Sequence, residues 1–162
     1  MKLYDWHAAP NPKRARMCIA EKGLDIEIIE VGGDDLKLRP DYIAKFPQAM
    51  VPMLELPDGR QIGESMAICR YLEELHPAPP LLGRNAYERA IVDMWERRAF
   101  DEGMMAAGEV FRNTADAFRD RGLPGFASPV AQIPALVERG RERLGHFFRK
   151  FDQQLGKHRY VA

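Results

Sequence analysis

Residues 46–65 constrain the fold of this chain most, because they hold a strand, a tight turn, a second strand and a helix start in direct succession. An Asp-Gly pair at 58–59 tolerates the positive φ angles that tight hairpin turns require. A short apolar strand at 53–56 precedes the turn, and the second strand ends at Gly-Glu-Ser, residues 63–65. Ser65 is the expected N-cap of the helix that follows. The stretch therefore predicts a hairpin that leads straight into a helix.

Val51 and Pro52, which stand directly before the hairpin, predict a place where a peptide ligand can pair with the chain. Proline has no backbone N–H, so Pro52 marks the end of sheet pairing and leaves the backbone of Val51 for a ligand. A cis bond between the two would hold this loop in one shape. The start of the following helix favours a carboxylate, and Glu64 beside it can accept from an ammonium group. These features suit a small peptide that carries an amino-acid head group.

The remainder of residues 1–76 predicts a thioredoxin-like α/β domain with the element order βαβ-ββα. The expected elements are strands at 2–6 and 26–31, helices at about 12–22, 40–45 and 65–75, and the hairpin described above. A strand, a helix and a strand within about thirty residues form a right-handed parallel unit. The hairpin adds two strands, so the expected sheet is mixed, four-stranded and covered by helices.

A proline-rich linker, 77–84, separates this domain from an all-helical second domain, 85–162. One long helix is expected from the N-cap Asn85 to about Phe118, and a loop rich in glycine and proline follows it. A second helix is expected at about 133–155, because apolar residues recur there at helical spacing.

Charge and cysteine content narrow the classes of function. Lysine plus arginine and aspartate plus glutamate each number 24, so the net charge is zero and neither a nucleic acid nor a membrane is an expected partner. No apolar run approaches the roughly 20 residues of a membrane helix, and the first residues are typical of a strand rather than a signal peptide. Cys18 and Cys69 form no Cys-x-x-Cys motif, so we expect two buried reduced thiols, no metal site and a cytoplasmic location.

Four short motifs carry a resemblance to a known family: Val51-Pro52, Gly63-Glu64-Ser65, Ile68 and Tyr71-Leu72. Together they resemble the glutathione-binding half of bacterial-type cytosolic glutathione S-transferases, and the resemblance extends from Met1 to about Ala162. It implies that glutathione is the co-substrate, that the helix start holds its γ-glutamyl carboxylate, and that the residue before the proline pairs with its cysteinyl backbone. The glutathione-binding residues implied are Lys37, Met50, Val51, Pro52, Glu64 and Ser65, with Arg39 and Gln48 as further candidates. Lys37 and Arg39 can equally be solvated charges.

The family's usual thiol activator is absent from the loop after the first strand. Members with a Ser-Pro-Asn-Pro run carry serine where this chain has Ala9, so the loop is kept without its hydroxyl. The chain thus resembles an atypical subgroup that lacks the N-terminal Ser, Tyr or Cys and holds a water near the thiol with groups of the second domain. The catalytic candidates are then Asn11, Asn113 and Thr114, with solvated or helix-capping residues as the alternative. Tyr4 and His7 are further candidates, interpreted otherwise as a core and a surface side chain.

The resemblance implies an enzyme that lowers the pKa of the glutathione thiol and adds the thiolate to small hydrophobic electrophiles, as in detoxification, or reduces peroxides. An adaptable apolar pocket for the electrophile is expected at Met104, Met105 and Phe111, unless these residues only pack helices together. The resemblance also implies a homodimer, in which Asp101 or Glu102 can reach the partner's site.

Two other functions stay open. A non-catalytic glutathione-binding or ligand-binding module of the same fold is favoured by Ala9, and a fragment with an incomplete helical domain is the third interpretation. In the family, further helices follow the position of Ala162. We therefore expect a shortened member or a truncated chain, in which the last two helices lack part of their apolar cover.

Overall fold

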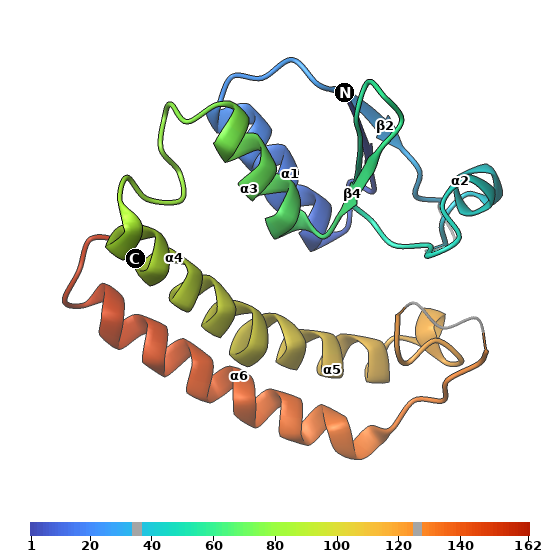
Figure 1. Cartoon of the computed structure of the whole chain (residues 1–162). Coiled ribbons are helices and arrows are strands. Elements are labelled where there is room, and N and C mark those ends of the chain that lie inside the picture. The colour runs from blue at the N-terminus through green and yellow to red at the C-terminus, as the bar shows by residue number, and fades with distance from the viewer. Residues whose placement is uncertain (34–36, 125–127) are drawn as a thin grey trace. The chain divides into compact units, whose positions relative to one another are not determined.

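The computed structural model describes residues 1–33, 37–124 and 128–162. The chain forms two compact units, Met1–Leu81 and Leu82–Ala162 (Figure 1). The boundary between the units falls within residues 77–84, the stretch expected to be a linker.

The first unit is built on a mixed four-stranded sheet. Its elements are β1 (Lys2–Asp5), α1 (Pro10–Glu21), β2 (Glu27–Glu30), α2 (Pro40–Lys45), β3 (Met53–Glu55), β4 (Gln61–Gly63) and α3 (Ser65–Leu75). The strand order is β2-β1-β3-β4, with β1 parallel to β2 and antiparallel to β3, and β3 antiparallel to β4. This arrangement confirms the expected thioredoxin-like fold.

The two faces of the sheet bury different sets of side chains, because successive residues of a strand point to opposite faces. Leu3 of β1 lies opposite Leu54 of β3, and both belong to the core that α1 and α3 cover. Tyr4 and Met53 are the next pair along, and they pack with Tyr42 in a second core that includes α2. The sheet is therefore covered on both faces, with the larger core beneath α1 and α3.

The start of α3 differs from the prediction. Ser65 is the first residue of the helix rather than its N-cap, and Glu64 stands in the cap position without a side-chain cap. Glu64 has a φ of 59°, an uncommon value for a residue other than glycine, and it makes the sharp turn from β4 into α3. Because Glu64 takes up this turn, Ser65 enters the helix and its hydroxyl faces α1 instead of capping α3.

The second unit consists of two long helical arms. Its elements are α4 (Ala86–Arg98), the π-helical segment η1 (Ala99–Met104), α5 (Met105–Thr114), the short 3₁₀ helix η2 (Asp116–Phe118) and α6 (Pro134–Leu155). Asn85 caps α4 as expected, since its side chain accepts a hydrogen bond from the Glu88 N–H at 3.0 Å. The prediction of a single helix from Asn85 to Phe118 was wrong in two respects. The observed helical arm ends at Thr114, and it widens into a π turn where the Met105 N–H bonds the Phe100 carbonyl.

Small residues let α6 pack closely against the first arm. A Cβ on Gly103 would lie 2.8 Å from the Phe147 ring, and one on Gly140 would lie 3.0 Å from the Ala106 carbonyl oxygen. Both glycines are buried, so neither tolerates a larger side chain without movement of α6.

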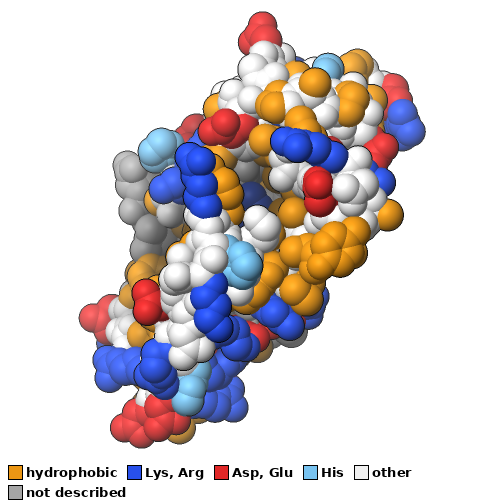
Figure 2. Space-filling model, turned by 90° about the vertical axis from the view of Figure 1, so that its left-hand side faces the viewer, with side chains coloured by type: hydrophobic (Ala, Val, Ile, Leu, Met, Phe, Trp, Pro, Cys, Tyr) orange, Lys and Arg blue, Asp and Glu red, His pale blue; other side chains and the backbone are white. Residues whose placement is uncertain are grey.

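Much of the apolar surface of the second unit stays exposed. Among its described residues, the buried hydrophobic side chains are Ala106, Phe118 and Val137, whereas Phe148 of α6 is 63% exposed. Figure 2 shows hydrophobic side chains interspersed with charged ones on one face of the molecule. None of the helices within the described ranges has the length and apolarity needed to cross a membrane.

Candidate functional site

The loop before β3 leads into the hairpin through a cis proline. The peptide bond between Val51 and Pro52 is cis, Pro52 is buried and Val51 is partly exposed. Because Met53 of β3 pairs with Gly63 of β4, the residues before Met53 and those after Gly63 lie at the same end of the hairpin. The sequence-predicted residues Val51, Pro52, Glu64 and Ser65 therefore gather at one end of the sheet.

Arg14 of α1 reaches the start of α3 and was not anticipated from the sequence. Its Nη1 donates a hydrogen bond to Ser65 Oγ at 3.3 Å, although the two residues are 51 positions apart. The guanidinium thus adds a positive charge where the first backbone N–H groups of α3 lack helical partners. The only sequence signal was that Arg14 borders the apolar stripe of α1, which fixes the side of the helix but not its partner.

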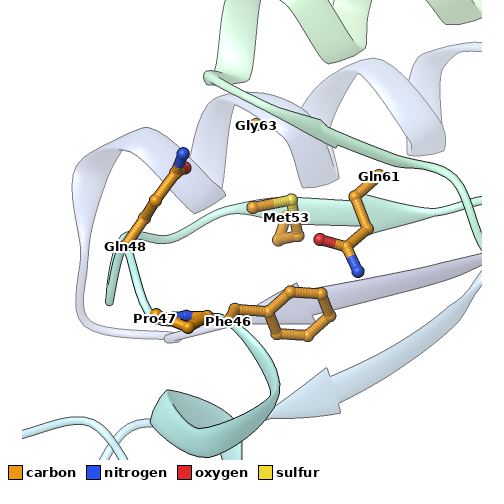
Figure 3. A pocket seen from close by; sticks show the side chains of 6 residues that line it. All are labelled: Phe46, Pro47, Gln48, Met53, Gln61 and Gly63. Carbon is orange, nitrogen blue, oxygen red and sulfur yellow. The ribbon is translucent and has the colours of Figure 1, made fainter.

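A cavity of about 340 Å³ lies beside this end of the hairpin. It is lined by Phe46, Pro47, Gln48, Met53, Gln61 and Gly63 (Figure 3). Figure 3 shows the Gln61 amide pointing toward the Phe46 ring, with Met53 between Gln48 and Gln61. The Tyr42 hydroxyl donates to the Met50 carbonyl at 2.6 Å, which fixes the loop that forms one wall.

The other candidates for glutathione contacts lie on exposed segments. Met50 is 36% exposed and Gln48 is exposed in the same loop. Arg39 pairs with Asp41 at 2.6 Å and also donates to the Glu30 carbonyl, so its guanidinium is already engaged. Lys37 is exposed, and its carbonyl accepts from the Gly33 N–H at 2.7 Å. A contact of Lys37 or Arg39 with a ligand stays a prediction.

The loop after β1 offers no hydroxyl at its end. Ala9 occupies the N-cap position of α1 in an extended conformation, and no side chain caps this helix. Asn11 is the second residue of α1 and is partly buried. The His7 side chain is exposed, while its backbone N–H donates to Glu30 Oε2 at 3.0 Å. Stabilisation of a thiolate by Asn11 stays a prediction.

Tyr4 belongs to a small polar cluster on the α2 side of the sheet. Its hydroxyl donates to Glu55 Oε2 at 3.1 Å and accepts from Lys45 Nζ at 2.6 Å. The hydrogen bond from Lys45 holds the pKa of Glu55 below its usual range, and the same contact raises the pKa of Lys45. Burial raises the pKa of the neighbouring Tyr42 to about 12. Because Tyr4 is buried and its hydroxyl already has two partners, it is a core side chain. This is the interpretation that the sequence offered as the alternative to a catalytic role.

Asn113 and Thr114 are the last two residues of α5, and their side chains bond to the backbone. The Asn113 amide donates to the Glu109 carbonyl at 2.7 Å, and its oxygen accepts from the Ile133 N–H at 2.7 Å. Thr114 Oγ1 donates to the Val110 carbonyl at 2.7 Å. The bond from Ile133 ties the end of α5 to the start of α6, whereas the bonds to Glu109 and Val110 lie within the last turn of α5. Both residues therefore have a structural role. Their part in orienting a water stays a prediction.

The three residues expected to form an electrophile pocket lie on the first arm of the second unit: Met104 ends η1, Met105 begins α5, and Phe111 lies further along α5. Met105 and Phe111 are 48% and 55% exposed, and Met104 is partly buried. The Phe111 ring packs edge-on against Phe118, with ring centroids 5.2 Å apart.

Among the described residues, no group of three or more His, Cys, Asp or Glu side chains is placed to hold a metal ion.

The structure so far is a thioredoxin-like unit followed by a helical unit, with a cis proline beside a helix start. This architecture can be compared with that of known protein families. Residues 3–80 match the family model of the glutathione S-transferase N-terminal domain. Over 169 aligned positions the chain is 30% identical to glutathione S-transferase 2 of Saccharomyces cerevisiae, covering 100% of this chain and 68% of that protein. The chain belongs to the glutathione S-transferase family.

Two further comparisons extend this result. Maleylacetoacetate isomerase of Pseudomonas aeruginosa is 38% identical over 95 residues, which cover 56% of this chain and 44% of that protein. The crystal structure of a glutathione S-transferase domain-containing protein of Marinobacter aquaeolei VT8 has a TM-score of 0.83 at 30% identity, over 100% of this chain and 78% of the other. The relatives are longer proteins, so their activities are proposals for this chain.

Proposed function

We propose that this chain binds glutathione and transfers its thiolate to small hydrophobic electrophiles. The observation that carries the proposal is that the cis Val51–Pro52 loop lies at the same end of the β3–β4 hairpin as the start of α3, where Arg14 bonds Ser65. Family membership supports glutathione as the co-substrate, and the yeast relative is itself a glutathione S-transferase.

Each part of the site has a separate role in this proposal. The γ-glutamyl carboxylate is bound by Ser65, the first N–H groups of α3 and the Arg14 guanidinium, which all favour an anion. The exposed Glu64 carboxylate accepts from the α-ammonium group of glutathione. The backbone of Val51 pairs with the cysteinyl residue, because Pro52 ends the ladder at this point. The thiol then lies toward Ala9 and Asn11.

A non-catalytic glutathione-binding module is the second candidate function, and one specific observation favours it. Ala9 stands at the N-cap of α1 and brings no hydroxyl to the place where a thiolate would be stabilised. Binding requires only the α3 start and Val51, so it does not depend on this residue. Catalysis depends on another donor, for which Asn11, Asn113 and Thr114 are the proposed groups.

A titration of the bound thiol distinguishes the two functions. Glutathione is added to the full chain, its affinity is measured by calorimetry, and thiolate absorbance is followed across neutral pH. An enzyme lowers the pKa of bound glutathione well below that of the free tripeptide. Binding without such a change supports the module, and the absence of binding to glutathione excludes both functions.

The broader setting follows from the same family and is also proposed. The chain acts as a homodimer in the cytoplasm, with an electrophile site near Met104, Met105 and Phe111 and with no nucleic acid or membrane as partner. The exposed side chains of Met105 and Phe111 support an apolar binding surface. Peroxides are the alternative second substrate.

A further inference from the structure

Three pairs of side chains join α1 to α3, one helical turn apart. They are Arg14 with Ser65, Cys18 with Cys69, and Lys22 with Glu73, and the partners of every pair are 51 residues apart. The constant separation means that the two helices run in the same direction and side by side, as Figure 1 shows. The first pair belongs to the proposed glutathione site and the third is a buried ion pair. The middle pair is used by neither.

Cys18 and Cys69 are the only two cysteines of the chain, and the fold places them together. They are 8% and 3% exposed and lie in the same hydrophobic core. The Cys69 side chain hydrogen-bonds to Cys18 and holds the pKa of the Cys18 thiol below its usual range, against the opposing effect of burial. The Lys22 ammonium adds to this lowering, and Glu73 opposes it. A thiol with a lowered pKa is more often in the reactive thiolate form, so Cys18 is assigned the attacking role.

We propose that Cys18 and Cys69 form a redox-active dithiol that small hydroperoxides oxidise to a disulfide between α1 and α3. The Cys18 thiolate attacks the outer peroxide oxygen, the O–O bond breaks, and the leaving oxygen takes a proton to become water or an alcohol. The Cys69 thiol then attacks the resulting sulfenic acid, an S–S bond forms, and the hydroxyl group leaves with the Cys69 proton as water. Two electrons pass from the sulfurs to the peroxide.

Burial decides which oxidant this site takes. A peptide disulfide needs access to an exposed sulfur, and neither thiol is more than 8% exposed. A small peroxide such as hydrogen peroxide needs only a brief local opening of α1 or α3. The site is also distinct from the proposed thiol chemistry on bound glutathione, since both of its sulfurs belong to the protein.

The test treats the native full chain, without glutathione, with hydrogen peroxide and then blocks the remaining thiols. Intact mass should fall by two hydrogen atoms, and peptide mapping should find the Cys18 peptide joined to the Cys69 peptide. The oxidised chain should unfold at a higher denaturant concentration than the reduced chain, because the link closes a long loop of the unfolded state. Addition of a thiol reductant should reverse both changes.

Controls make the result specific. Cys18→Ser and Cys69→Ser should lose the linked peptides, with Cys18→Ala and Cys69→Ala as variants that keep the core apolar. The wild-type mapping needs no variant, so a variant that fails to fold leaves the test intact. The proposal is overturned if the native chain gives no linked peptides while the denatured chain does, if Cys18 is oxidised to a sulfinic acid without a link, or if glutathione disulfide forms a mixed disulfide on the native chain faster than peroxide forms the link.

Discussion

Ser65 is only 4% exposed, yet its hydroxyl lies where α3 begins and in contact with the Arg14 guanidinium. A carboxylate bound at this point would meet a fixed cation, a hydroxyl and the free N–H groups of a helix start. Each of these favours an anion, and a guanidinium binds a carboxylate with defined geometry. At the scale of single residues, the proposed specificity of the site therefore depends on Arg14 as much as on Ser65.

Replacing Arg14 should weaken glutathione binding. We expect Arg14→Gln to raise the Kd about tenfold or more, because hydrogen bonds to charged groups contribute about 1.5–3 kcal/mol. Calorimetric titration with glutathione at fixed ionic strength measures the change. Lys13→Gln is the matched control. Lys13 is an exposed neighbour of Arg14 on α1, and its replacement by glutamine removes the same positive charge. An equal loss in both variants would show that general charge, rather than a contact, is responsible.

Ala9, at the N-cap position of α1, is the second residue whose replacement has a predictable effect. We expect Ala9→Ser to increase the free energy of unfolding by about 1 kcal/mol, because α1 has no side-chain cap and serine is a favoured N-cap. Denaturant unfolding measures this, and Ala8→Ser, one position outside the cap, should have no such effect. The new hydroxyl should also lower the thiol pKa of bound glutathione. A gain in stability with an unchanged thiol pKa would mean that the hydroxyl is committed to the cap.

The residues of the site could be predicted unevenly from the sequence. Val51, Pro52, Glu64 and Ser65 stand in one short stretch, so turn and helix signals were enough to bring them together. Arg14 could not be found, because its contact depends on how α1 rotates against α3. The N-cap assignment of Ser65 failed for a local reason: the positive φ of Glu64 cannot be read from its side-chain type.

A buried ion pair between Lys22 and Glu73 holds the end of α1 against α3. The Lys22 side chain is fully buried, pairs with Glu73 at 2.6 Å, and donates to the carbonyls of His76 and Pro79 at 2.6 and 3.0 Å. We expect Lys22→Met to lower the free energy of unfolding by about 3–5 kcal/mol, because it leaves a carboxylate in the interior without its cation. Urea unfolding is the measurement.

A second substitution checks that reason. Lys22→Met combined with Glu73→Gln should recover part of the loss, since it removes the unpaired charge. Lys13→Met, on an exposed part of the same helix, should change stability by less than about 0.5 kcal/mol. A double variant no more stable than Lys22→Met would assign the loss to the linker carbonyls instead.

The contact between α2 and β3 predicts a dependence on pH. Folding lowers the pKa of Glu55, so its ionised form stabilises the fold above the unfolded pKa of about 4.3, and this stabilisation is lost as the pH falls through the lower folded value. Folding raises the pKa of Lys45, so its share is present below about 10.4 and is lost as the pH rises through the folded value. The pair thus acts between these limits.

Glu55→Gln tests this pH window. Because Lys45 is 45% exposed, we expect a loss of at most about 1 kcal/mol at neutral pH, and the difference from wild type should shrink as the pH falls below about 4. Urea unfolding at a series of pH values gives the curve. A difference that stays constant into strong acid would rule out the ionised carboxylate as its source.

Elements were predicted better than their details. The mixed four-stranded sheet was expected from the parallel unit and the hairpin, because both are set by local sequence. The pairing of β1 with β3, which joins these two units, is a long-range contact that local sequence does not set. The π turn at Ala99–Met104 was not foreseen, because the apolar spacing of an α-helix continues through it. It accompanies the close approach of Gly103 to the Phe147 ring, a tertiary contact that helical periodicity does not encode.

At the scale of the whole molecule, the two units differ in how much apolar surface they bury. The first contains two hydrophobic cores, whereas the described residues of the second bury few large side chains. We expect the second unit to unfold at a lower denaturant concentration than the first. Each unit holds one of the two tryptophans, Trp6 and Trp95, so fluorescence can follow them separately.

Trp6→Phe and Trp95→Phe supply that measurement. The chain that keeps Trp95 should report the earlier transition, and circular dichroism at the same denaturant concentrations should show partial loss of helix. Coincident transitions in both variants would instead show that the units unfold as one cooperative body.

The π turn has a consequence for the length of the chain. Its wider hydrogen bond, from the Met105 N–H to the Phe100 carbonyl, spans one residue more than a regular helical turn. The extra residue is thus taken up within Ala99–Met104, so a deletion of one amino acid there would restore regular α-helical spacing while the residues after it keep their faces. Ala106 would then keep its buried position, whereas the same deletion within the regular turns of α4 would rotate everything after it by about 100°. This segment is therefore where the long arm should best tolerate the loss of a single residue.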